Sequence, residues 1–75
     1  MEKTIIVLAA VDQHSLQFKG ADVEETHCET VGEAKARAKY VLTTEYQRIT
    51  ESSQKLGYSQ VIVNGVCVAD YDSHN

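Results

Sequence analysis

Proline is absent from this chain, and glycine occurs only four times among its 75 residues. Proline-rich, glycine-rich and repetitive segments are typical of linkers and low-complexity tails, so the composition argues against both. A chain of this length is long enough for one domain and too short for two. We therefore expect residues 1–75 to form a single domain.

Long apolar runs are missing as well. The apolar stretch at residues 5–11 is far shorter than the about 20 residues that a membrane-spanning helix needs. It is also at the lower limit for the core of a secretory signal, and Glu2 offsets Lys3 in front of it. We expect this stretch to be a buried strand and the protein to have no membrane partner.

Cysteine is scarce, with Cys28 and Cys67 as the only two and no CxxC spacing. Two thiols in a chain without a secretory signal are expected to remain reduced, which predicts a cytoplasmic protein. His27 and Cys28, flanked by Glu25 and Glu29, are the one local group of potential metal ligands. Adjacent strand residues point to opposite faces, so we predict no metal ion and no other cofactor.

The formal net charge is −4, from eleven acidic and seven basic residues. This balance opposes attraction to nucleic acid, so we do not expect a nucleic-acid partner. One stretch is acidic: Asp22, Glu24, Glu25, Glu29 and Glu33. It is either a solvated edge strand or, in a less favoured hypothesis, a mimic of phosphates in an inhibitor of a nucleic-acid-binding protein.

Residues 4–11 are rich in β-branched side chains and apolar on both sides, which predicts a central strand. Between residues 16 and 29 apolar and polar side chains alternate more weakly. Leu16 and Phe18 lie in its first part, and Val23, Glu25 and His27 in its second. This pattern predicts one or two edge strands.

A helix is predicted to follow. Thr30 and Glu33 have the spacing of a capping box, and Glu33 and Arg37 have that of an i,i+4 ion pair. Apolar residues then recur at helical spacing: Val31, Ala34, Ala38, Val41, Leu42, Tyr46, Ile49 and Leu56. Gly57 follows as a stop signal. The pattern predicts one helix of about six turns, which residues 50–53 can interrupt.

The C-terminal part is predicted to form a β-hairpin. Asn64-Gly65 is the preferred pair for a type I′ turn, and a two-residue loop sets the register. That register pairs Ile62 with Cys67 and Val61 with Val68. One face is then rich in valine: Val61, Val63, Val66 and Val68. The other face carries Tyr58, Gln60, Ile62, Cys67, Ala69 and Tyr71.

These elements predict an α+β fold in the order β-(β)-α-β-β. The antiparallel or mixed sheet has three to five strands, and one long helix packs on one face. The second face of the sheet is also largely apolar. Only the segment with Leu16 and Phe18 remains to cover it, and exposed apolar faces usually mark interfaces.

We therefore predict a small non-enzymatic binding or regulatory protein that associates with itself, as a dimer, or with a protein partner. The predicted partner-binding residues share the second face: Tyr58, Ile62, Cys67, Ala69 and Tyr71. No catalytic residue is predicted. The alternative is a small enzyme or ligand- or metal-binding subunit whose site forms between chains, with His27, Cys28 or Asp70 in a shared cleft.

Overall fold

A computed structural model describes residues 3–18, 23–46 and 55–73. The elements in this part of the chain are β1 (Ile5–Ala10), α1 (Gln13–Phe18), β2 (Glu24–Cys28), α2 (Val31–Tyr40), β3 (Tyr58–Val63) and β4 (Val66–Asp72). The strands form one antiparallel sheet in the order β2-β1-β3-β4. The predicted α+β class is confirmed, with two helices in place of one.

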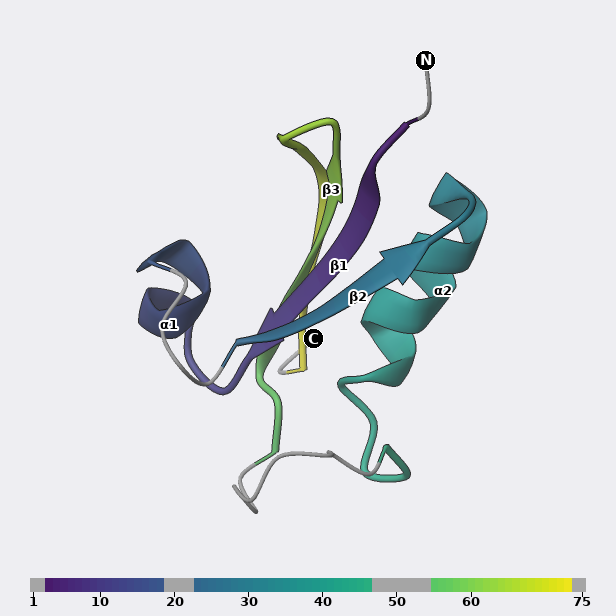
Figure 1. Cartoon of the computed structure of the whole chain (residues 1–75). Coiled ribbons are helices and arrows are strands. Elements are labelled where there is room, and N and C mark those ends of the chain that lie inside the picture. The colour runs from purple at the N-terminus through teal and green to yellow at the C-terminus, as the bar shows by residue number, and fades with distance from the viewer. Residues whose placement is uncertain (1–2, 19–22, 47–54, 74–75) are drawn as a thin grey trace.

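β1 is the central strand that its sequence predicts, because it pairs with β2 on one side and β3 on the other. Its side chains alternate between two cores. Val7 packs under α2, whereas Leu8 packs under α1. The two helices consequently lie on opposite sides of the sheet, as Figure 1 shows. We call the side under α2 the helix face and the side under α1 the second face.

Small residues on α2 pack against the centre of the helix face. Ala34 and Ala38 are fully buried against Ile5, Val7 and Val61. Alanine opposite larger branched residues lets a helix approach a sheet closely. A second cluster joins Ala9 to three residues from the chain between α2 and β3: Val41, Leu42 and Leu56.

The predicted start of α2 is confirmed. Thr30 is the N-cap, and its hydroxyl oxygen accepts a hydrogen bond of 3.0 Å from the Glu33 amide. The Glu33 carboxylate accepts a 3.3 Å hydrogen bond from the Glu29 amide, one residue before the cap. Since Glu33 is turned back in this way, no salt bridge to Arg37 forms among the described residues, contrary to our prediction.

The prediction of one long helix is wrong, because α2 ends at Tyr40 after ten residues. Each of its last four carbonyl oxygens already has a donor. Val41 N donates to Arg37 O, Ser59 Oγ to Ala38 O, Leu42 N to Lys39 O, and Thr43 N and Oγ1 to Tyr40 O. Threonine favours such local bonds over continuing a helix. Four residues of the predicted stripe therefore lie outside α2: Val41, Leu42, Tyr46 and Leu56. Ile49 lies outside the described residues.

Gly57 serves a different purpose from the predicted helix stop. Its amide donates to Ala10 O and its carbonyl accepts from Ser73 N, both at 2.9 Å. A Cβ atom at this position would stand 2.6 Å from the Val11 carbonyl oxygen. The close approach of two backbones therefore requires glycine here.

The predicted hairpin turn is confirmed. Asn64 and Gly65 both have positive φ, 51° and 84°, as a type I′ turn requires. The turn is also tied to the start of β1. Asn64 N donates to Thr4 O at 2.9 Å, and Thr4 N donates to the Asn64 side-chain oxygen at 3.0 Å. Asn64 therefore joins three strands as well as turning the chain.

The predicted register of the hairpin is correct only near the turn. Ile62 pairs with Cys67 as expected, but Val61 then pairs with Ala69, because a bulge leaves Val68 without a partner in β3. Every later residue of β4 changes face. The predicted register would have placed Asp70 against α2; with the bulge Tyr71 takes that side, and the charged carboxylate avoids the core.

Candidate functional site

The second face is only partly covered by the described residues. α1 lies over the end of β1, where Leu16 is buried against Leu8 and Ala10. This segment was predicted as an edge strand, and that prediction is wrong: Asp12 caps a helix by accepting a 2.6 Å hydrogen bond from the Ser15 amide. That bond is also the main reason why the pKa of Asp12 is lowered. The alternative prediction was that this segment covers the second face of the sheet. It is correct for Leu16, which is the buried residue of α1.

A groove of about 590 Å³ lies beside α1 and runs to the hairpin turn. Its floor is made by three apolar side chains, those of Ile6, Leu8 and Ile62, and Leu16 forms one side. The remaining lining residues are Gln13, Gln17, Glu25, Gln60 and Gly65. We call this feature the open groove. Within residues 3–18, 23–46 and 55–73, Glu25 is the only charged residue in its lining. The groove therefore favours an occupant that combines an apolar part with hydrogen-bonding groups.

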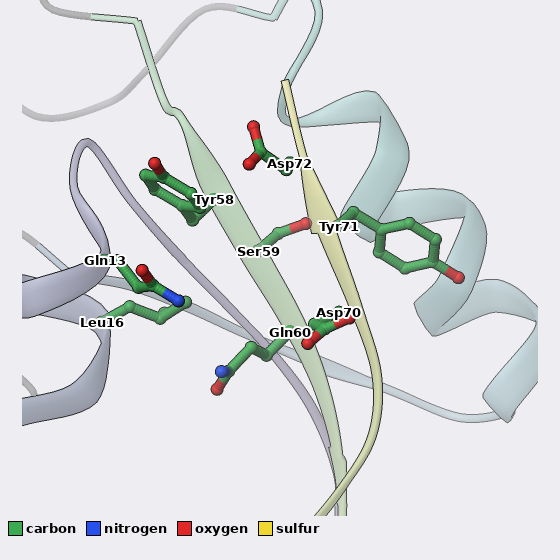
Figure 2. A pocket seen from close by; sticks show the side chains of 8 residues that line it. All are labelled: Gln13, Leu16, Tyr58, Ser59, Gln60, Asp70, Tyr71 and Asp72. Atoms are coloured by element: carbon green, nitrogen blue, oxygen red, sulfur yellow. The ribbon is translucent and has the colours of Figure 1, made fainter. Parts of the chain in front are cut away.

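A second, more polar pocket of about 300 Å³ adjoins the open groove and shares Gln13, Leu16 and Gln60 with it (Figure 2). Asp70 and Asp72 stand at its β4 side. The two hollows together give an apolar centre bordered by amides and carboxylates. This is the usual anatomy of a protein–protein interface, with an apolar core inside a polar rim.

Three of the five predicted partner-binding residues lie on the second face. Ile62 forms the groove floor, Tyr58 packs beside Leu16, and Cys67 is exposed near the turn. The other two, Ala69 and Tyr71, lie on the helix face because of the bulge. Figure 2 shows Tyr71 directed toward α2 and Tyr58 directed toward α1. The structure therefore does not bring the five residues together on one surface.

Sequence reasoning missed the outer side of α1. Phe18 is 65% exposed there, and its ring lies 4.7 Å from that of His14, one helical turn earlier. The signal in the sequence was Asp12, a preferred N-cap residue that stands four positions before the apolar Leu16. Read in that way, Leu16 points inward and Phe18 outward.

A tyrosine and arginine cluster lies on the opposite side of the molecule. The Arg37 guanidinium carbon is 5.2 Å from the Tyr46 ring centroid and 6.0 Å from that of Tyr40. The Tyr46 hydroxyl donates a 2.7 Å hydrogen bond to Glu24. Burial, followed by this contact with Glu24, raises the pKa of Tyr46. The cluster fastens the segment after α2 to the edge strand β2, which is a structural role.

The residues of the enzymatic alternative do not meet within one chain. His27 is on the second face of β2, Cys28 is on its helix face, and Asp70 is on β4 at the other edge of the sheet. Burial raises the pKa of the Cys28 thiol, so that it favours the unreactive protonated form. Among the described residues, no group of three potential ligands is placed to hold a metal ion.

The acidic residues do not form a single surface either. Glu24 and Glu25 point to opposite faces of β2, and Glu33 bonds the backbone before α2. Asp22 lies outside the described residues. This arrangement gives no support to a mimic of nucleic-acid phosphates.

No protein-family model, curated protein or solved structure matches this chain. In the part of the chain that the structure describes, neither helix has the length and apolar character needed to cross a membrane.

Proposed function

We propose that this protein is a small non-enzymatic binding module and that the open groove on its second face receives an apolar surface of a protein partner. The observation that carries the proposal is the unequal cover of the two faces. α2 covers the centre of the helix face, where its alanines are fully buried, and leaves Val66 near the turn well exposed on that side. By contrast, α1 has six residues and leaves Ile6 and Ile62, in the two central strands of the second face, partly exposed. Apolar surface left uncovered in this way is a common mark of interaction sites.

The lining of the open groove supports a protein as the partner. Three glutamines, Gln13, Gln17 and Gln60, surround its apolar floor. Their amides both donate and accept hydrogen bonds, so they can satisfy polar groups at the margin of an interface. Tyr58 lies beside this floor and is of a residue type enriched at interfaces.

We further propose that the protein acts in a reducing compartment such as the cytoplasm. Cys28 and Cys67 are both free, and they lie on opposite faces and on opposite edge strands of the sheet. That separation is too large for a disulfide within one chain. Free thiols are typical of proteins in reducing compartments, where the cell keeps cysteines reduced.

Site-specific photo-crosslinking tests the docking surface. A benzophenone amino acid is placed at position 62 in the groove floor and, as a matched control, at position 40, where Tyr40 is 44% exposed on α2. Cells that produce each variant are irradiated and the adducts are identified by mass spectrometry. We expect a discrete protein adduct from position 62 and none above background from position 40.

Equal labelling from both positions, or no adduct from position 62, would contradict the proposal. An adduct with any single protein supports it, because the partner, whether another protein or a second copy, must reach the groove floor. Circular dichroism and a melting curve of each purified variant establish that it is folded. Only folded variants are compared.

A further inference from the structure

We infer that the occupant of the open groove is a second copy of this chain and that Phe18 of each copy fills the groove of the other. This inference rests on the proposed function and names its partner. It starts from two features of the second face that a single chain leaves unmatched. One is the open groove of about 590 Å³ with its apolar floor. The other is the Phe18 side chain, which is 65% exposed on α1 beside it.

The directions of the α1 side chains follow from helix geometry. At about 100° per residue, His14 and Phe18 lie roughly opposite Leu16 around the helix axis. Leu16 is 4% exposed and faces the sheet, so the stacked rings of His14 and Phe18 point away from it. α1 therefore carries an apolar residue on each side, although its own chain covers only one of them.

A two-fold axis places the two features against each other. This two-fold axis lies between the two sheets and is perpendicular to their strands. Rotation about it sets the second faces of the two copies against each other, with their strands running in opposite directions. The part covered by α1 in one copy then lies over the open groove of its partner. Both α1 helices share one layer between the sheets, and each outward Phe18 meets the partner's Ile6 and Ile62. The contact is isologous, as in most soluble dimers.

The size and polarity of the surfaces suit this arrangement. A standard interface takes about 800 Å² from each partner, which is about 15% of the 5296 Å² surface of the chain. One sheet face with its helix is large enough to supply that area. Each of the two Phe18 side chains becomes buried in the dimer. Because Phe18 is 65% exposed in the single chain, it contributes about two thirds of the roughly 150–250 Å² that a fully buried aromatic side chain removes from water. Among the described residues, Glu25 is the one charged residue that lines the open groove, and the His27 side chain lies 3.7 Å from its carboxylate. Asp70 and Asp72 lie on β4, at the edge of the second face, so they would belong to the polar rim of the interface.

The test is the solution mass, measured by light scattering over a dilution series. We expect the wild-type protein to have twice the 8.3 kDa mass of one chain. Phe18→Asp places a charge in the partner's groove and should halve the mass. Tyr40→Asp is the matched control, because Tyr40 is an exposed aromatic residue on the other side of the sheet, and it should leave the dimer intact. Phe18→Ala serves as a milder variant should the aspartate impair folding.

A wild-type protein that stays at 8.3 kDa at every concentration would overturn the inference. A Phe18→Asp protein that is folded and still dimeric would overturn it as well, since the groove would then not receive Phe18. Neither result removes the proposed function. In both cases, photo-crosslinking from position 62 to a different protein would show that the groove has another occupant.

Discussion

The two faces of this sheet are built from strands of similar composition, yet they end in different states. On the helix face, ten-residue α2 sets Ala34 and Ala38 directly on the strands, and Ser59 satisfies a carbonyl at the helix end. On the second face, six-residue α1 reaches the sheet through Leu16 alone among its buried residues. The helix face is covered where α2 lies on it, although Val66 near the hairpin turn stays 63% exposed on that side. On the second face the centre of the sheet itself, at Ile6 and Ile62, is only partly covered.

The difference shows how unevenly a short chain distributes its buried apolar residues over the two faces of one sheet. A domain of this size buries only about 60% of the surface of its unfolded chain, so it has little material with which to cover two faces. Under the proposed function, the helix face provides most of the stability and the open groove provides the surface for association. Substitutions on the helix face should therefore change stability, and those in the open groove should change association.

The largest expected effect is on the helix face. Leu56 is fully buried with Ala9 and Val41, so Leu56→Ala should lower the free energy of unfolding by about 2–5 kcal/mol. Ile62→Ala, in the partly exposed groove, should cost clearly less. Urea unfolding followed by circular dichroism measures both, in a Phe18→Asp background that keeps association out of the comparison. Equal losses would show that the two faces are equally closed.

Gly57→Ala tests the backbone contact that joins β3 to the end of β1. The added Cβ would lie 2.6 Å from the Val11 carbonyl oxygen, so one of the two segments must move. We expect a loss of about 1–3 kcal/mol, the usual range for overpacking a tight site. Gly32→Ala is the control, because open space surrounds that position, and it should be neutral or stabilising. Similar losses for both would contradict the account of Gly57.

Asn64→Ala is expected to destabilise the hairpin by about 1–2 kcal/mol, because alanine resists the positive φ of 51° at this position. It also removes the hydrogen bond from Thr4 N. Asn64→Gly keeps the backbone conformation accessible and removes only the side-chain bond, so it should cost less. Thermal unfolding of the two variants separates these contributions. A glycine variant as unstable as the alanine variant would assign the effect to the Thr4 bond.

The local signals in the sequence were sufficient for the parts of the fold that short-range chemistry determines. Asn64-Gly65, the Thr30 cap and the two-sided apolar run of β1 were all predicted and confirmed. The end of α2 could not be predicted from the local pattern. The stripe continued to Leu56, but Thr43 and the distant Ser59 satisfy the last carbonyls of the helix. A partner on another element cannot be seen in helical periodicity.

The candidate site was predicted in part for a similar reason. The turn fixed Ile62 opposite Cys67, but the bulge at Val68 moved Ala69 and Tyr71 to the other face. Nothing in the hairpin sequence alone marks the bulge. Its benefit appears only when α2 is in place, because Asp70 would otherwise face the core. Phe18 was missed because alternation over a few residues fits a strand as well as a helix.

The smallest effect concerns reactivity and not stability. Cys67 is exposed on the second face, whereas Cys28 packs partly against the core and burial raises its pKa. The thiolate is the reactive form, so at a given pH Cys28 should react more slowly with a maleimide than Cys67. Peptide mass spectrometry after timed labelling gives both rates. Faster labelling of Cys28 would mean that the edge of the helix face is more open than described.

Methyl NMR of isoleucine-labelled protein over a dilution series tests the central claim most directly. Ile5 and Ile6 are neighbours in β1 that point to opposite faces, so each serves as a reference for the other. We expect the methyl signals of Ile6 and Ile62 to shift on dilution as the open groove loses its occupant, while that of Ile5 stays unchanged. Signals of Ile6 and Ile62 that remain as constant as that of Ile5 would contradict association through the second face.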